Sequence, residues 1–365
     1  MFILKKKDFL FSIIVPVYNV EKYIEKSLDS IVDAMDVDCE VIIVNDGSTD
    51  NCDSIIKEYI ESRVPTRFKD NFVYIFKENK GLSDTKNVGI DVSRGKYISV
   101  VDSDDRVSVD FYETARKYIK QDYDVIIYDL YLDFEKDSKL NYIARAFRDD
   151  FHGDFFCKIM MGAMLGSSCN KIIRKDLYKY KFPVGKQYED VCVTPFILID
   201  AKKIKYVPNP NYIYLQREKS IVSSNSLDGA FYKICSNLSN VLLEIGDYDK
   251  YSEIIYVFFL DRTIDMLDMS LKKDRRNFLE KIKKFYDDNR IVIEYVINSQ
   301  LIETKKSLFT DKQYKVLSII YNHLYNKNFK KVKRILVFRR IGKWVREILI
   351  SIKRFFKIVF GGIYG

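Results

Sequence analysis

Residues 11–50 read FSIIVPVYNV EKYIEKSLDS IVDAMDVDCE VIIVNDGSTD, with two short apolar runs on either side of a helical pattern. The runs, 11–17 and 40–45, are rich in Val and Ile and lack polar alternation, which is typical of strands buried on both faces. The segment near 21–35 has the apolar spacing of an amphipathic helix. Strand, helix and strand in this order predict a parallel pair joined by a helical crossover.

The same alternation continues to about residue 131. Further strands are expected at 72–76, 97–101 and 125–130, and further helices near 50–62, 83–92 and 109–120. The prediction is an α/β fold with a mostly parallel twisted sheet and flanking helices. Two more strands are expected near 170–174 and 212–216, and the pattern is helical from about 228 to 326.

Composition is that of an ordinary globular chain of 365 residues, 47% hydrophobic and 31% charged. The six cysteines form no Cys-x-x-Cys pair and no secretory signal is visible, so we expect reduced thiols in a cytoplasmic protein. His152 and His323 are the two histidines, and their separation argues against a histidine-based zinc site or Ser-His-Asp chemistry. No apolar run reaches the roughly 18–20 residues that span a bilayer.

Polar loops follow the predicted strands at their carboxyl ends, where parallel sheets bind ligands. One of them, Asp102-Ser103-Asp104-Asp105, holds three carboxylates, which repel one another unless a cation or hydrogen-bond donors offset their charge. Hard oxygen ligands favour Mg²⁺ or Mn²⁺, which bind through one or two carboxylates plus substrate phosphates. The alternative is a solvated turn in which Asp104 or Asp105 caps the helix near Val109.

The loop after the second predicted strand reads Asn45-Asp46-Gly47-Ser48-Thr49-Asp50. The glycine permits a tight turn, and any of the three residues after it can cap the next helix. These roles leave Asp46 free to accept hydrogen bonds from a nucleotide base or ribose. The segments 78–81 and 86–89 also admit a purely structural interpretation, as a loop and an exposed helix in which Gly89 allows close packing on the sheet.

Together these motifs resemble glycosyltransferase family 2, the inverting enzymes of GT-A fold. The family's Pro-x-Tyr-Asn matches residues 16–19, and its Asp-Gly-Ser-x-Asp matches residues 46–50. Its Asn-x-Gly, followed by a basic residue and Asn-x-Gly, matches residues 79–89, and its Asp-x-Asp-Asp matches residues 102–105. The resemblance covers roughly residues 10–131 and implies a GT-A nucleotide-diphospho-sugar transferase fold followed by an α-helical C-terminal region.

The resemblance also implies a set of residues that contact the nucleotide sugar: Pro16, Tyr18, Glu21, Asp46, Asn79, Gly81, Lys86, Asp102, Ser103 and Arg217. Within this set, Tyr18 would lie against the base and Asp46 would bond to the base or ribose. Asp104, with Asp102, would hold a divalent cation, Mn²⁺ or Mg²⁺, on the diphosphate. The family usually has Arg where this chain has Lys86, and Lys lacks the planar fork of a bidentate contact.

A Glu-Asp pair further along the chain, Glu189-Asp190, matches the family's catalytic pair. Inverting transfer needs a base that takes the proton of the acceptor hydroxyl as its oxygen attacks the anomeric carbon. The resemblance implies that Asp190 is this base and that Glu189 positions the acceptor. The alternative is that both are first-turn acids of a helix over 189–200, favoured by the helix dipole.

Two weaker matches lie nearby. Asn170-Lys171 matches an Asn-Lys pattern of the family, although Cys169 stands where the family has an aromatic residue. Residues 217–220 resemble a loop whose Arg and Ser contact the diphosphate, and a solvated basic turn is the alternative. The sequence has neither the membrane spans nor the Gln-x-x-Arg-Trp motif of the family's processive polymerases, so we expect one sugar to be added per encounter.

The net charge of +9 is concentrated near the C-terminus. Residues 327–365 contain twelve Lys or Arg and one acid, which leaves a net charge of about −2 on the residues before them. Apolar residues recur every three or four positions over 338–360, which predicts a basic amphipathic helix. We expect this tail to bind the anionic inner leaflet of the cell membrane, and no nucleic acid. Packing onto the helical region is the alternative.

The sequence therefore predicts a GT-A domain over 1–220, a helical region over 221–326 and a membrane-surface tail over 327–365. The expected activity is metal-dependent transfer of one sugar from a UDP-sugar to a lipid-linked or oligosaccharide precursor of a surface polysaccharide. Nucleotidyl transfer is disfavoured, because it usually relies on an early Gly-rich basic phosphate loop that the sequence lacks. A nucleotide-sugar sensor or membrane scaffold without turnover is the alternative, against which the intact carboxylates argue.

Overall fold

The computed structural model of the chain describes residues 8–147, 155–160, 164–186, 188–217, 255, 277–288, 290–298 and 311–336. The chain divides into two compact units. One comprises residues 1–226 and 236–246, and the other comprises residues 227–235 and 247–365.

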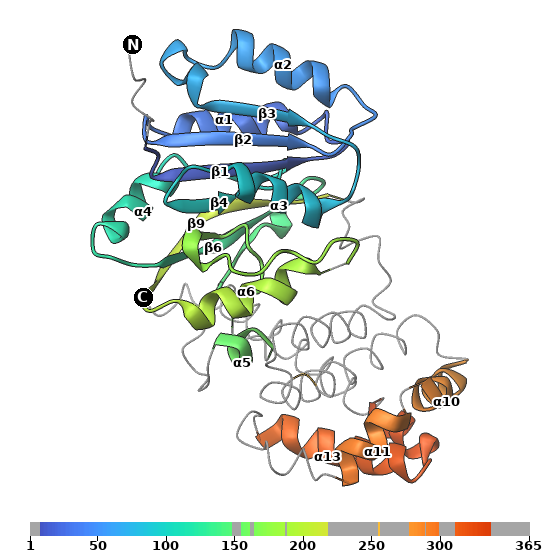
Figure 1. The fold of residues 1–365 in the computed structure, drawn as a ribbon. Coiled ribbons are helices and arrows are strands. Elements are labelled where there is room, and N and C mark those ends of the chain that lie inside the picture. Colours follow the sequence, from blue (N-terminus) through green and yellow to red (C-terminus); the bar gives the residue numbers. More distant parts are fainter. Residues whose placement is uncertain are drawn as a thin grey trace, which may run out of the picture. The chain divides into compact units, whose positions relative to one another are not determined.

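The described residues of the first unit form a nine-stranded mixed sheet with flanking helices (Figure 1). Its strands are β1 (Phe11–Val17), β2 (Cys39–Asn45), β3 (Phe72–Phe76), β4 (Tyr97–Val100), β5 (Arg106–Val107), β6 (Val125–Phe134), β7 (Tyr142–Ala144), β8 (Lys171–Arg174) and β9 (Ile204–Gln216). Its helices are α1 (Ile24–Ala34), α2 (Cys52–Ser62), α3 (Leu82–Val92), α4 (Phe111–Ile119), α5 (Phe155–Met160) and α6 (Glu189–Asp200). Short 3-10 turns are η1 (Thr66–Asn71), η2 (Ser138–Leu140) and η3 (Lys175–Leu177).

Strand direction divides the sheet into two halves. Strands β3, β2, β1 and β4 are neighbours in that order and all run parallel. The order continues with β8, β6, β9 and β5, and here β8 is antiparallel to both of its neighbours, as β5 is to β9. β6 and β9 are parallel, and β7 pairs with β6. The predicted strand–helix alternation is confirmed in the parallel half, which brings the loops after its four strands to one edge.

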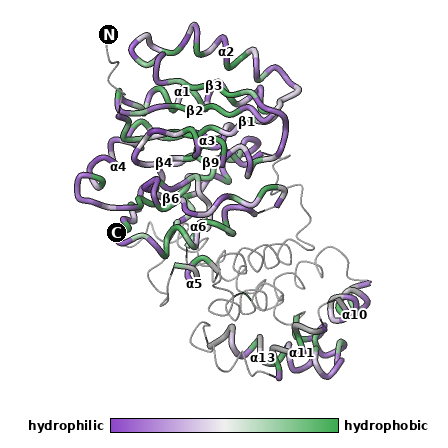
Figure 2. Tube along the Cα trace, in the orientation of Figure 1, coloured by the Kyte–Doolittle hydropathy of each residue, from purple (hydrophilic) through white to green (hydrophobic). Residues whose placement is uncertain are grey.

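Two neighbouring strands of the parallel half, β1 and β2, are buried along their whole length, whereas the edge strand β3 is partly exposed. Every residue of β1 and β2 is buried, as expected for strands covered on both faces. Figure 2 shows hydrophobic residues along these strands and prominent hydrophilic residues along α2. Helix α3 packs closely on β1 at Gly89, where an added Cβ would lie 2.4 Å from Ile14 Cγ2. The predicted close helix–sheet packing at this glycine is confirmed.

The last strand is longer than the sequence predicts. β9 begins at Ile204, well before the expected start near residue 212. It contains Pro208 and Pro210, which have no amide hydrogen to donate to a sheet and therefore disguise the strand in the sequence. Its pairing with β6 shifts register opposite these prolines. The strand then continues to Gln216, beside the loop that follows β4.

The described residues of the second unit are helical, in agreement with the sequence pattern. Its helices are α10 (Phe278–Asp288), α11 (Arg290–Asn298) and α13 (Asp311–Tyr325), followed by a helical segment at 329–336. Val332 and Leu336 are buried, so the first ten residues of the predicted tail pack within this unit. The predicted amphipathic helix over 338–360 lies outside the described residues. Among those described, no helix combines the length and apolar character needed to cross a membrane.

Candidate active site

Residues 102–105 form a tight turn after β4 that we call the acid turn. The Asp105 N–H closes it by donating to Asp102 O at 2.9 Å. Because β4 is parallel to β1, the acid turn emerges at the same edge of the sheet as the loop after β1. Ser103 is buried within the turn, whereas Asp102 and Asp104 are partly exposed. Two of the three carboxylates are therefore open to a ligand.

The end of β9 holds the acid turn in place. The Tyr212 hydroxyl donates to Asp105 Oδ2 at 2.8 Å and accepts the Asp102 N–H at 3.1 Å. The Leu215 N–H donates to Asp105 Oδ1 at 2.8 Å. Asp105 is thus bound at both oxygens, and the alternative in which it caps the next helix is wrong, since α4 begins only at Phe111.

Arg217 follows β9 directly and lies against the acid turn. Its Nε donates to Asp104 Oδ2 at 2.7 Å, and its guanidinium carbon lies 5.1 Å from the centre of the Tyr23 ring. Two residues that the sequence places at the diphosphate, Asp104 and Arg217, are therefore brought together. The remainder of the predicted diphosphate loop, residues 218–220, lies outside the described residues.

Burial and crowding make negative charge costly in the acid turn. Burial raises the pKa of Asp102 to about 7, against the opposing charge of Lys86, and Asp104 adds to the rise. Burial also raises the pKa of Asp105 well above its usual range. Carboxylate oxygens that are penalised for their charge in this way fit a hard divalent cation.

A thiol also lies near these carboxylates. Asp102, Asp105 and Cys169 have potential metal-binding atoms that all lie within 4.8 Å of one another. However, both Asp105 oxygens already accept hydrogen bonds, and burial raises the pKa of the Cys169 thiol, which disfavours the thiolate that metals bind. Asp102 and Asp104 remain the pair of ligands that we expect.

Glu189 and Asp190 open α6, where their carboxylates meet a buried lysine from α3. Lys86 is 2% exposed, and its Nζ lies 2.8 Å from both Glu189 Oε1 and Asp190 Oδ1. Ser168 donates to Asp190 twice, from its N–H at 3.1 Å and from its hydroxyl at 2.8 Å. Tyr188, which precedes the pair, has φ of 61°, a left-handed conformation that persists only where the surroundings enforce it.

The buried ammonium sets the protonation of this group. Burial raises the pKa of Asp190, but Lys86 and the two hydrogen bonds from Ser168 outweigh it and hold the pKa below its usual range. Despite burial, Asp190 and Glu189 in turn raise the pKa of Lys86 well above its usual range. At neutral pH an ammonium therefore lies beside an ionised Asp190, which is able to accept a proton.

This arrangement departs from the sequence expectation for Lys86. The structural alternative places it on an exposed helix, whereas the structure buries it where α3 meets the start of α6. The contact with the donor that the resemblance implies stays a prediction. The reason is electrostatic, because adjacent carboxylates at Glu189 and Asp190 would repel one another without a cation between them. The interpretation of this pair as first-turn helix acids alone does not account for these contacts.

Asp46, at the end of β2, is 3% exposed and fully engaged. One oxygen accepts the Lys77 ammonium and the Lys80 N–H at 2.9 Å, and the other accepts the Gly81 N–H at 2.8 Å. Asp46 is therefore not without partners in the protein, and its predicted bond to a base or ribose stays a prediction. Its carboxylate organises the loop after β3, where the positive φ of Gly81 (89°) permits the turn.

The other residues expected at the nucleotide occupy neighbouring loops. Pro16 is buried in β1, Tyr18 beyond its end is 49% exposed, and Asn79 is exposed in the loop after β3. Glu21 accepts the Asn51 N–H at 3.0 Å and its side-chain amide at 2.8 Å, and so joins the loops after β1 and β2. Tyr18 and Asn79 therefore present open side chains, while Pro16 and Glu21 shape the loops around them.

The acid turn and the Glu-Asp pair act on one another. Asp190 and Glu189 contribute to the raised pKa of Asp102, and Asp102 contributes to the raised pKa of Lys86. These four residues come from three separate elements and lie far apart in the sequence. The structure thus gathers them into one electrostatic environment.

Two residues of this site are not marked by the sequence. Ser168 lies next to the weakly matching segment 169–171, which is the one signal that points toward it. Tyr212 lies in an apolar strand pattern and has no signal of its own. Both act through contacts that span more than twenty residues, so only the tertiary structure assigns them.

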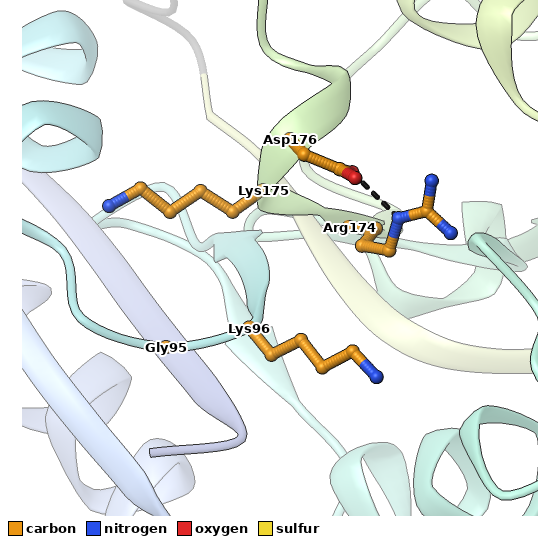
Figure 3. Close-up of a pocket in the computed structure, with 5 residues that line it drawn as sticks. All are labelled: Gly95, Lys96, Arg174, Lys175 and Asp176. Carbon is orange, nitrogen blue, oxygen red and sulfur yellow. Dashed lines mark hydrogen bonds and ion pairs between the residues drawn. The ribbon is translucent and has the colours of Figure 1, made fainter. Parts of the chain in front are cut away.

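A separate pocket lies between the start of β4 and the end of β8 (Figure 3). It is lined by Gly95, Lys96, Arg174, Lys175 and Asp176. Arg174 donates to Asp176 at 2.6 Å, and the Lys175 ammonium donates to Ser93 O. Because the acid turn follows the other end of β4, this pocket lies away from the candidate active site.

Residues 12–181 match the profile of glycosyl transferase family 2. The chain is also 30% identical over 227 residues to the glycosyltransferase GlyG of Streptococcus pneumoniae serotype 4, in an alignment of 58% of this chain and 73% of GlyG. The chain belongs to glycosyltransferase family 2. It is accordingly a glycosyltransferase.

A further relative and a solved structure align with more of this glycosyltransferase. The minor teichoic acid biosynthesis protein GgaB of Bacillus subtilis is 25% identical over 316 residues, which are 82% of this chain but 34% of GgaB. The crystal structure of S. aureus TarS residues 1–349 in complex with UDP-GlcNAc superposes with a TM-score of 0.65 at 22% identity, covering 91% of this chain and 92% of TarS 1–349. This likeness confirms the predicted GT-A fold.

Proposed function

We propose that this glycosyltransferase transfers a single sugar, with inversion, from a UDP-sugar to a hydroxyl of a surface-glycan precursor. The observation that carries the proposal is the contact of Asp190 with the buried Lys86 ammonium at 2.8 Å and with two donors of Ser168. These contacts favour an ionised Asp190, whose charge also acts on Asp102 in the acid turn. The relatives support the substrate class, because GgaB is named for minor teichoic acid biosynthesis and TarS was solved with UDP-GlcNAc.

In this proposal Asp190 is the general base. Its lowered pKa keeps it ionised at neutral pH, so it is ready to take the proton of the acceptor hydroxyl. The proton moves to the carboxylate as the acceptor oxygen bonds to the anomeric carbon and the bond to the diphosphate breaks. Lys86 and Ser168 hold the carboxylate in place, and Glu189, bound to the same ammonium, positions the acceptor.

A divalent cation, Mn²⁺ or Mg²⁺, would be held by Asp104 and Asp102. When bound, it supplies positive charge that stabilises the departing diphosphate. Arg217 already contacts Asp104 and so lies where a second positive charge can bond to the diphosphate. Ser103 lies buried between the two ligands in the acid turn.

The nucleotide would bind in the loops after β1, β2 and β3. Tyr18 is exposed and can stack on the base, with Pro16 and Glu21 shaping its surroundings. Asp46 acts through the loop that it organises, since it bonds to Gly81 and holds Asn79 in the adjoining turn. Lys86 contributes to the donor side only indirectly, through the charge balance of the site.

A screen of nucleotide sugars by thermal stabilisation tests the donor and the metal together. We expect UDP-sugars to raise the melting temperature in Mn²⁺ or Mg²⁺ and to have little effect after chelation. Sugar nucleotides with other bases serve as matched controls. Equal stabilisation with and without metal would contradict the metal assignment, and stabilisation by another base alone would contradict the UDP assignment.

We further propose that the protein binds the inner face of the cell membrane through its basic tail. The buried Val332 and Leu336 make residues 327–336 part of the helical unit, so the membrane-binding segment begins after them. Residues 337–365 still hold seven Lys or Arg and one Glu. Each basic residue near anionic lipid contributes roughly 1 kcal/mol.

Sedimentation with vesicles tests this placement. We expect the full chain to sediment with vesicles rich in anionic lipid, less so in high salt, and a chain ending at Leu336 to remain in the supernatant. Donor binding by the shortened chain shows that it is folded. Equal sedimentation of the two forms would contradict the membrane role of the tail.

A further inference from the structure

Lys171, the first residue of β8, is a buried cation that the proposed mechanism does not use. It is 0% exposed. Its ammonium donates to Leu165 O at 2.8 Å, to Ser167 O at 2.6 Å and to Asn170 Oδ1 at 3.0 Å. These three acceptors are uncharged, and all belong to the loop of residues 165–170, which we call the serine loop.

The serine loop presents Ser168 to Asp190. Both donors of Ser168, its N–H and its hydroxyl, point at the Asp190 carboxylate. The loop is anchored to β6 at its far end, because the side-chain amide of Asn170 donates to Tyr128 O at 2.6 Å and Asn170 O accepts the Tyr128 N–H at 3.0 Å. The Lys171 ammonium fastens the middle of the loop, on either side of Ser168.

A lysine in this position is costly. An ammonium removed from water loses solvation that neutral oxygens restore only in part, and burial accordingly lowers the pKa of Lys171 to about 8. Lys86 differs, since two carboxylates compensate its burial. An apolar side chain of similar length would avoid the cost at Lys171 but would leave the Leu165 and Ser167 carbonyls without this donor.

We propose that Lys171 is a positioning residue for sugar transfer: its ammonium fixes the serine loop so that both donors of Ser168 stay aimed at Asp190. This inference rests on the proposed role of Asp190 as the base. In this arrangement Lys171 does not contact the reacting atoms. It acts through Ser168, whose hydrogen bonds favour the ionised form of Asp190.

The charged and titratable groups that also influence Asp190 are Lys86, Glu189, Asp102, Cys169, Tyr178 and Cys192. None of them is altered by a substitution at residue 171. A change in the acid limb of the pH profile of transfer therefore reports either the position of Ser168 or the lost charge of Lys171 itself. A double-mutant cycle separates these two causes.

The test compares Lys171→Met, Ser168→Ala and the double variant. We expect each single variant to move the acid limb of kcat/KM upward by about one pH unit, since a carboxylate loses hydrogen bonds that favour its charged form. We expect the double variant to move no further than Ser168→Ala alone. UDP binding in Mn²⁺ should stay within about twofold in all three. Additive shifts would show that Lys171 acts by charge, which would overturn the proposal.

Hydrogen exchange of a peptide covering the serine loop gives a readout that does not depend on activity. We expect Lys171→Met to speed exchange there by roughly tenfold or more as the loop loosens. Lys175→Met is the matched control, because Lys175 lies on the same segment, also donates to a backbone carbonyl, and lines the remote pocket of Figure 3. It should change neither the exchange of the loop nor the acid limb.

Lys171→Gln keeps the test decisive if the Met variant does not fold, because an amide can still donate to one of the carbonyls. We then expect intermediate effects on both readouts. An unchanged acid limb together with unchanged loop exchange in a folded variant would overturn the proposal. If Asp190→Asn itself leaves transfer intact, the proposed function fails, and loop exchange still decides whether Lys171 fixes the serine loop.

Discussion

The two carboxylate groups of the candidate active site are chemically alike, but the pKa values of Asp102 and Asp190 are shifted in opposite directions. The acid turn after β4 raises the pKa of Asp102 to about 7, because burial and the neighbouring Asp104 penalise its charge. The start of α6 lowers the pKa of Asp190, because Lys86 and Ser168 outweigh the same penalty. Negative charge is therefore costly in the acid turn, whereas at the start of α6 a lysine of this chain stabilises it.

In the proposed mechanism this difference gives two roles to the same type of side chain. A carboxylate that is costly to ionise gains most from an external cation, as a metal and diphosphate site requires. A carboxylate held ionised by permanent partners keeps its proton-accepting form across the neutral range. Arg217 compensates part of the negative charge of Asp104, whereas the charge of Asp190 is fully compensated. Asp104 and Asp190 therefore differ only in degree.

The largest expected effect is at Asp190. Asp190→Asn should lower transfer by roughly 10²-fold or more, because the amide cannot accept the proton. UDP binding in Mn²⁺ should be unchanged, since the acid turn is intact. Initial rates and calorimetric titration measure the two quantities. Near-normal turnover would move the base to Glu189 or elsewhere.

A substitution in the acid turn should weaken UDP binding, which Asp190→Asn leaves unchanged. Asp104→Ala should weaken metal-dependent UDP binding by at least about tenfold, because a ligand of the cation is lost. Asp110→Ala is the matched control, an exposed acid that precedes α4 in the same segment. Calorimetric titration with UDP and Mn²⁺ measures both variants. Unchanged affinity in Asp104→Ala would contradict its metal role and remove one side of the comparison.

The hydroxyl that supports the acid turn should have a smaller effect. Tyr212→Phe removes the donor to Asp105 and the acceptor of the Asp102 N–H, so metal-dependent UDP binding should weaken by about tenfold or less. The acid limb of transfer should stay in place, because Asp190 keeps its partners. A shifted acid limb in this variant would show that the two groups cannot be perturbed separately.

The smallest expected effects are on stability. When a chelator has removed divalent cations, Asp102→Asn and Asp190→Asn should change the melting temperature in opposite directions. Asp102→Asn should raise the melting temperature by roughly a few degrees at pH 8, because the raised pKa means that ionising Asp102 costs stability. The gain should shrink as the pH falls from about 7 toward 5, where Asp102 is already protonated in the folded protein.

Asp190→Asn should lower the melting temperature at pH 8. A lowered pKa means that the ionised carboxylate stabilises the folded protein at pH values above the usual pKa of an aspartate. That contribution disappears as the pH falls through the lowered folded pKa, so the two proteins should converge in acid. Thermal unfolding followed by circular dichroism measures both variants. Equal signs would contradict the electrostatic contrast.

The sequence by itself determined the succession of strands and helices along the chain in the parallel half and the position of its loops. The strand near Phe11 begins and ends where its apolar run does, because a strand buried on both faces must be apolar throughout. The strand near Phe72 also keeps its predicted bounds, although it lies at the edge of the sheet and is only partly buried. The loop motifs are local as well, since each follows directly on its strand. The acid turn and the Glu-Asp pair could therefore be located before any contact was known.

Only the tertiary structure decided what those residues touch. Lys86 meets Asp190 across 104 positions of sequence, Tyr212 meets Asp105 across 107, and Asp46 meets Gly81 across 35. Nothing in the local pattern encodes such contacts, because they depend on which strands become neighbours and on how closely helices approach them. The protonation of each carboxylate follows from burial and from these distant partners, so it could not be predicted from residue type and spacing.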